Sequence, residues 1–104
     1  MAKRLAPKPV QPVVSDGVEY AADGDGRDQY VVAKDLGSGK VLWRVKVFHN
    51  HIKPWMETDV QEVYITDLKL SAGSLLVRDE RSQCYLVDLK RRQVKIENCG
   101  AMFH

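Results

Sequence analysis

The residues best suited to chemistry in this 104-residue chain lie in one short stretch, from Phe48 to Asp59. His49 and His51 are separated by one residue, so their side chains project to the same side of an extended chain. Glu57 could fold back toward them and supply a carboxylate. Two imidazoles and a carboxylate are a minimal ligand set for zinc or a similar metal ion. The pattern predicts a metal-binding site at His49, His51 and Glu57; the alternative is a surface loop whose histidines bind no metal.

The same region offers two kinds of binding surface. Arg44, Lys46 and Lys53 would form a basic surface able to contact phosphates, with an aromatic residue beside it. Trp55 and Met56 follow a proline, and aromatic residues and Met are enriched in protein interfaces. We rank the protein interface first, because alternate charges on a strand are usually its solvated face.

Other chemistry is less well supported. Asp23, Asp25 and Asp28 lie in ADGDGRD, but the spacing fails the register of a calcium-binding EF-hand loop, which favours an ordinary glycine-rich hairpin loop. Serines, histidines and cysteines are present, yet no nucleophile has a local catalytic signature. Cys84 falls inside a predicted strand, where a small buried core residue is expected. The sequence therefore favours a protein without enzymatic activity.

Composition sets the wider limits. Lys and Arg total 16 against 14 Asp and Glu, and a net charge of +2 is too small to indicate nucleic acid or a membrane as a partner. Prolines at 7, 9 and 12 interrupt the N-terminal segment, so no signal peptide is predicted, and no apolar run approaches the roughly 20 residues of a membrane span. Two cysteines make no dense disulfide framework. We expect free thiols and a cytoplasmic location.

The elements that must position these residues are strands. Short β-rich runs alternate with turn signals, and no window has a helical period long enough to compete, although one helical turn is possible between 53 and 63. In 40–48, Val41 and Trp43 belong to an apolar face, and Arg44 and Lys46 belong to a basic one. The predicted strands are 18–22, 30–36, 40–48, 60–71, 74–79, 83–89 and 93–97. Residues 1–14 are predicted to form a flexible Pro-rich arm, and 15–104 a single domain.

An internal repeat links two of these hairpins. Residues 30–43 read YVVAKDLGSGKVLW and residues 83–96 read QCYLVDLKRRQVKI, so that Asp35 aligns with Asp88. In both copies an apolar strand ends in Asp-Leu, a turn follows, and a second apolar strand begins. An aspartate in this place can accept hydrogen bonds from turn amides.

The first copy closely resembles the repeat of the pyrroloquinoline-quinone-enzyme type of β-propeller. The matching residues are Ala33, Asp35, Gly39, Lys40 and Trp43. The second copy retains Asp88 but lacks the glycine, and Ile96 stands in the position of the tryptophan. The resemblance implies blade-like hairpins and a structural tryptophan, with Asp35, Gly39, Trp43 and Asp88 as structural residues. It does not imply the quinone, because that family holds its cofactor with many blades, and we predict no cofactor.

Chain length then limits the architecture. A propeller needs about four or more blades of four strands each, and the predicted strands suffice for fewer than two blades. We predict an all-β fold, a small antiparallel sandwich or half-barrel of about seven strands built from blade-like hairpins. The favoured function is a non-enzymatic protein-interaction or assembly module that forms a homodimer. A metal-dependent enzyme and a nucleic-acid-binding protein are the two alternatives.

Overall fold

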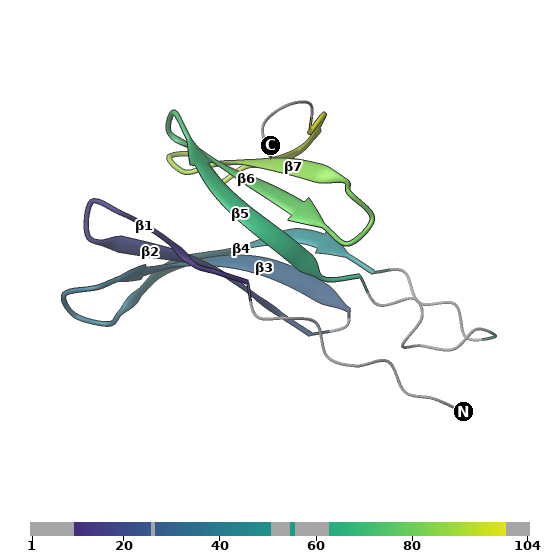
Figure 1. Ribbon diagram of the computed structural model, residues 1–104. Helices are drawn as coiled ribbons and strands as arrows, with labels where there is room; N and C mark the ends of the chain where they lie inside the picture. Colours follow the sequence, from purple (N-terminus) through teal and green to yellow (C-terminus); the bar gives the residue numbers. More distant parts are fainter. Residues whose placement is uncertain (1–9, 26, 51–54, 56–62, 100–104) are drawn as a thin grey trace.

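A computed structural model describes residues 10–25, 27–50, 55 and 63–99, and the regular structure in these ranges is all β-strand (Figure 1). Eight strands are present: β1 (Val13–Ser15), β2 (Val18–Gly24), β3 (Asp28–Asp35), β4 (Val41–His49), β5 (Ile65–Ser71), β6 (Ser74–Asp79), β7 (Cys84–Asp88) and β8 (Val94–Glu97). They form two antiparallel four-stranded sheets, in the orders β1-β2-β3-β4 and β5-β6-β7-β8. The predicted small antiparallel sandwich is confirmed. Nothing in these ranges forms a helix long and apolar enough to span a bilayer.

The strand missing from the prediction is β1. Val13 pairs with Tyr20 and Ser15 with Val18, so the first sheet begins at Val13, inside the segment assigned to the arm. Asp16 and Gly17 join the two strands with φ values of 50° and 74°. Two successive positive φ values define a type I′ turn, whose twist matches that of the flanking strands. Residues 1–9, and most of the 53–63 segment with its predicted helical turn, lie outside the described ranges.

The core lies between the two sheets, which pack face to face (Figure 1). Strand alternation places apolar side chains of both sheets on the facing surfaces. The buried cluster consists of Val31, Val47, Ile65, Leu75, Val77 and Val87. Phe48 and Tyr85 stack across the interface with their ring centroids 5.2 Å apart, so an aromatic pair joins β4 to β7. One continuous core therefore holds both halves of the chain together.

The last hairpin of each sheet contains a turn closed by hydrogen bonds to an aspartate, called here the aspartate-closed turn. In the first sheet the Gly39 amide donates to the Asp35 carbonyl over 2.7 Å, and in the second the Arg92 amide donates to the Asp88 carbonyl over 2.6 Å. Gly39 has a φ of 75° and Arg92 a φ of 57°. Arg92 thus adopts the left-handed conformation that glycine adopts at lower cost. The second copy lacks the glycine, yet its turn has the same backbone hydrogen bond and a left-handed residue at the same place.

A second link repeats as well. The Leu36 amide donates to the Gly17 carbonyl over 2.9 Å, and the Leu89 amide donates to the Gly73 carbonyl over 3.3 Å. Each aspartate-closed turn is therefore hydrogen-bonded to the first hairpin of its own sheet. The expectation of fewer than two blades' worth of strands is wrong, because the chain contains two complete four-stranded antiparallel meanders.

Trp43 is half-buried and packs against the core. It pairs with Ala33, which in turn pairs with Tyr20 on β2, and the two aromatic rings are 6.0 Å apart beside the small alanine. The register shifts between Ala33 and Lys34, because Lys34 pairs with Val41. This irregularity turns Val41 outward, so that its side chain is 60% exposed. The prediction that Val41 belongs to the buried face of its strand is therefore wrong.

The second sheet has no such shift between β7 and β8. Leu86, the counterpart of Ala33, pairs with Lys95, whereas Ile96 pairs with Tyr85 and is 72% exposed. Ile96 aligns with Trp43 in the sequence but does not occupy its place in the structure. The pairing of β7 with β8 lacks the extra residue that shifts the register between β3 and β4, and this explains why Ile96 and Trp43 lie in different places.

The two sheets stack like successive copies of one unit, with the front of one against the back of the other. Val31 and Ala33, four and two residues before Asp35, are fully buried on one face of β3, and Val31 belongs to the core cluster. The residue two before Asp88 is Leu86, but here the neighbouring Val87 faces the core, so alternation turns Leu86 to the opposite face. The two sheets therefore do not contact each other through equivalent faces. Instead, one face of the first sheet packs against the opposite face of the second.

The position of Trp43 gives a direct test of this packing. We expect Trp43→Ala to lower the free energy of unfolding by about 3 kcal/mol, the lower end of the range for large aromatic residues, because Trp43 is half-buried. Leu42→Ala is the matched control, since Leu42 is 53% exposed, and it should change stability by less than about 0.5 kcal/mol. Urea unfolding measures both, and equal effects of the two substitutions would contradict the packing of Trp43.

Candidate functional site

His49 is held by a carboxylate at one end of the first sheet. It pairs with Asp28 across β3 and β4, and its Nδ1 lies 2.6 Å from Asp28 Oδ1. Lys46 Nζ lies 3.5 Å from the same oxygen. The hydrogen bond to His49, helped by the charge of Lys46, holds the pKa of Asp28 below its ordinary value. The structure therefore gives His49 a carboxylate partner that the sequence did not suggest.

The predicted metal site cannot be assembled from the described residues. His51 and Glu57 lie outside the described ranges, and within those ranges no group of three His, Cys, Asp or Glu side chains could hold a metal ion. Asp28 places a further carboxylate oxygen, a possible metal ligand, beside His49. The metal site at His49, His51 and Glu57 stays a prediction.

The predicted basic surface carries acidic residues between its basic ones. Arg44 Nη2 lies 3.3 Å from Asp23 Oδ2, and the guanidinium stacks 3.6 Å above the centre of the Tyr30 ring. Lys46 shares Asp28 with His49, as described above, and Lys53 lies outside the described ranges. Arg44 and Lys46 thus have carboxylate partners, which lowers the positive potential that phosphate binding requires.

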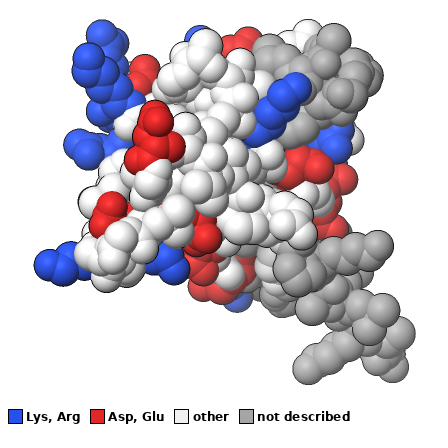
Figure 2. Space-filling view, turned by 60° about the vertical axis from the view of Figure 1, so that its left-hand side comes forward, with Lys and Arg blue, Asp and Glu red and all other residues white. Residues whose placement is uncertain are grey.

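Charges on another face are equally mixed. Figure 2 shows Lys and Arg side chains set close to Asp and Glu side chains, around a centre of uncharged residues. Further ion pairs join Lys34 to Glu19 at 3.8 Å and Arg78 to Asp67 at 2.8 Å. These pairs spread the small net charge over the surface.

The predicted interface residue Trp55 is exposed. Its side chain is 78% accessible, and Met56 lies outside the described ranges. Asn50, 7% exposed, fixes the base of the segment that carries Trp55. Its side-chain amide donates to the Val63 carbonyl over 3.0 Å, and its backbone amide donates to the Arg27 carbonyl over 2.6 Å. Residues 50 and 63, where the chain passes from one sheet to the other, are thereby joined.

The glycine-rich loop between β2 and β3 is closed by its own aspartate. The amides of Arg27 and Asp28 donate to Asp25 Oδ1 over 2.8 and 2.9 Å. These two bonds lower the pKa of Asp25. Asp23 is turned to Arg44 and Asp28 to His49, so the three aspartates serve different partners. This arrangement is that of an ordinary hairpin loop, as favoured from the sequence.

Another aspartate, which the sequence analysis missed, organises the turn between β6 and β7. Asp79 is only 4% exposed and accepts hydrogen bonds from the amides of Arg81 and Gln83 at 2.8 and 3.0 Å. The Tyr85 hydroxyl donates to its other oxygen over 3.0 Å. Burial, with the nearby carboxylate, raises the pKa of Tyr85, so this hydroxyl remains a donor at all physiological pH values. An aspartate at the end of an apolar strand, followed by polar residues, would have been a usable signal for this turn, because an aspartate side chain can accept a hydrogen bond from the backbone amide two residues on.

The two cysteines form a disulfide, so the expectation of free thiols is wrong. Cys84 pairs with Glu97 across β7 and β8, which brings Cys99, two residues farther along, within a Cα–Cα distance of 5.3 Å. This separation lies in the usual range for a disulfide. Cys84 is fully buried, as predicted for its strand. No local pattern indicates this pairing, because it depends on the register of β7 and β8.

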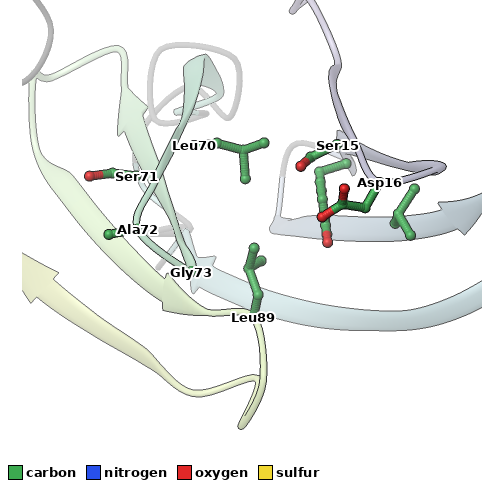
Figure 3. Close-up of a pocket in the computed structure, with 9 residues that line it drawn as sticks. Ser15, Asp16, Leu70, Ser71, Ala72, Gly73 and Leu89 are labelled. Carbon is green, nitrogen blue, oxygen red and sulfur yellow. The ribbon is translucent and has the colours of Figure 1, made fainter.

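A groove of about 330 Å³ lies between the sheets, where the turns β1–β2 and β5–β6 come together (Figure 3). The described residues that line it are Ser15, Asp16, Val18, Tyr20, Leu70, Ser71, Ala72, Gly73 and Leu89. In Figure 3, Leu70 and Leu89 point into the groove from the second sheet, opposite Ser15 and Asp16 of the first. This groove was not predicted, because one of its walls depends on β1, a strand too short to show a pattern in the sequence.

Comparison with known proteins gives no family. No protein-family model matches this chain, and no curated protein matches it by sequence.

The disulfide should contribute measurably to stability. Its sequence separation is 15 residues, and closing a loop of this length stabilises a fold by about 3 kcal/mol in the chain-entropy model. We expect reduction and Cys99→Ser to lower the free energy of unfolding by similar amounts in urea titrations. Two reactive thiols per native chain in the absence of reductant would contradict the disulfide.

The aspartate-closed turns predict a particular response to acid. Asp35 accepts hydrogen bonds from the Ser38 hydroxyl and amide, and Asp88 from the amides of Arg91 and Lys90; these bonds lower the pKa of both carboxyl groups. A pKa lowered by folding gives stability that is complete above the unfolded pKa, about 3.9, and is lost as pH falls through the folded pKa.

We therefore expect wild type to exceed the double variant Asp35→Asn, Asp88→Asn in stability at pH 7. The difference should shrink as pH is lowered from about 4 to 2. Urea midpoints at several pH values measure it, and parallel curves for the two proteins would contradict the assignment.

Proposed function

We propose that this chain is a non-enzymatic protein-interaction or assembly module, and that it forms a homodimer through an open strand edge. The observation that carries the proposal is the location of its exposed large apolar side chains. Val14 on β1, Val41 and Leu42 on β4, and Ile96 on β8 are between 53% and 72% exposed. Apolar residues on unpaired edges favour pairing with another chain.

Strand β4 is the favoured edge. It has nine residues, more than any other strand of the described ranges, and its outer side has no strand neighbour within its sheet. Val41 and Leu42 are adjacent, and Leu36, 47% exposed, belongs to the same hairpin. Main-chain hydrogen bonds along a long edge would supply affinity, and these apolar side chains would add buried surface.

The repeated architecture supports the same proposal. Propellers are built by radial repetition of four-stranded blades, in which each blade meets the opposite face of the next. Each of the two sheets is a four-stranded meander with its own aspartate-closed turn, and one face of the first sheet packs against the opposite face of the second. This arrangement fits a pair of propeller-type blades. Such blades are stable when their faces and edges are covered by neighbours. An isolated pair therefore has surfaces suited to assembly.

The two alternatives have weaker support. Nucleic-acid binding would use Arg44 and Lys46, which are partnered by Asp23 and Asp28. Metal binding would use His49, but its predicted partner ligands His51 and Glu57 lie outside the described residues, and those residues contain no group of three possible ligands. A cytoplasmic location stays a prediction; the disulfide weighs against it, because disulfides persist mainly in oxidising compartments.

Sedimentation velocity tests the proposal. We expect the wild-type chain to be a dimer at micromolar concentration and Val41→Lys to be a monomer, because a lysine on an edge strand opposes pairing. Ile96→Lys is the matched control: it places the same charge at an exposed position on the edge strand of the other sheet, and it should leave the dimer intact. Both substitutions are at exposed sites and should alter stability by less than about 0.5 kcal/mol.

Two outcomes would contradict the proposal in different ways. A wild-type chain that stays monomeric at high concentration would exclude the homodimer. A dimer that Ile96→Lys disrupts and Val41→Lys does not would move the interface to β8.

A further inference from the structure

The groove between the turns β1–β2 and β5–β6 has apolar side chains on part of its wall and one carboxylate, that of Asp16, at its rim. Val18, Tyr20, Leu70 and Leu89 are half-buried and line it. Asp16 is the charged member of the described lining residues, and it is exposed. Figure 3 places the oxygens of Ser15 and Asp16 on the side that faces Leu70 and Leu89. A ligand in the groove would therefore meet apolar carbon on one side and a carboxylate on the other.

Both walls of the groove are fixed before any ligand binds. Asp16 and Gly17 form one tight turn, and Ala72 and Gly73, with φ values of 44° and 81°, form the matching turn of the second sheet. The carbonyls of Gly17 and Gly73 are each held by an amide of an aspartate-closed turn, as described above. A preformed wall costs little conformational entropy on binding, which favours recognition of a small group.

The size and chemistry of the groove indicate the kind of group. Its volume, about 330 Å³, is at the lower end of the range for ligand sites, which suits one amino-acid side chain with its backbone. An aliphatic stem with a cationic end would match the apolar interior and Asp16 together. A guanidinium fits better than an ammonium, because its planar fork can bond a carboxylate with two N–H groups, donate further to Ser15 and stack on an aromatic ring such as Tyr20.

We propose that this groove binds an arginine side chain of a partner protein. The arginine stem lies against Leu70 and Leu89, and the guanidinium is bonded to the Asp16 carboxylate. This inference rests on the proposed role of the chain as an interaction module, and it names the chemistry of a partner that the β4 edge does not specify.

An NMR titration of the full chain with N-acetyl-arginine amide tests the inference. We expect saturable shifts of the backbone amide signals of Gly17, Gly73 and Leu89. N-acetyl-citrulline amide has nearly the same shape without the charge and should bind about fivefold more weakly, the effect of an exposed charge pair. Asp16→Asn should weaken arginine binding by a similar factor, and it should fold, because asparagine is favoured in a type I′ turn.

Asp23→Asn is the matched control, since Asp23 is an exposed carboxylate at the opposite end of β2 and should leave binding unchanged. The absence of shifts at these amides, or equal binding of the citrulline probe, would overturn the inference. Equal binding of N-acetyl-lysine amide would overturn the choice of a guanidinium. None of these results bears on the β4 edge, so the sedimentation experiment still decides the proposed homodimer independently.

Discussion

The turn closed by an aspartate at the end of each sheet organises this protein. Asp35 and Asp88 accept amide hydrogen bonds through their side chains and backbone carbonyls, which fixes the last hairpin of each sheet. The next residue, Leu36 or Leu89, is bonded to the first hairpin of the same sheet. One short sequence, Asp-Leu, therefore connects the first and last hairpins of a four-stranded sheet. The groove exists because the two sheets bring these hairpins close together at one end.

Much of this fold could be predicted from the sequence. The alternation in β4, the glycines before it and the Asp-Leu repeat predicted antiparallel hairpins, and the structure contains them. Strand β1 was missed because three residues give too short a pattern, although Asp16-Gly17 between valines is a strong hairpin signal. The outward turn of Val41 could not be predicted, since a register shift depends on the partner strand.

The site residues show the same limit more clearly. The sequence identified His49, Arg44 and Lys46 by residue type, but not the aspartates beside them, because Asp23 and Asp28 are 21 residues from Arg44 and His49, respectively. The disulfide was mispredicted for a related reason: cysteine number and spacing do not reveal that the pairing of Cys84 with Glu97 brings Cys99, two residues beyond β8, next to Cys84. Contacts that depend on long-range strand pairing are thus the part of the site that composition and local pattern do not contain.

The two sheets pack so that one face of the first meets the non-equivalent face of the second. Nuclear Overhauser effects between side chains measure this most directly. This packing predicts contacts from Tyr85 and Val87 to the first sheet, with the Tyr85 ring close to that of Phe48, and no contact from Leu86 to Ala33. Strong effects between Leu86 and Ala33 would mean that the two sheets meet through the same face, and they would contradict the account.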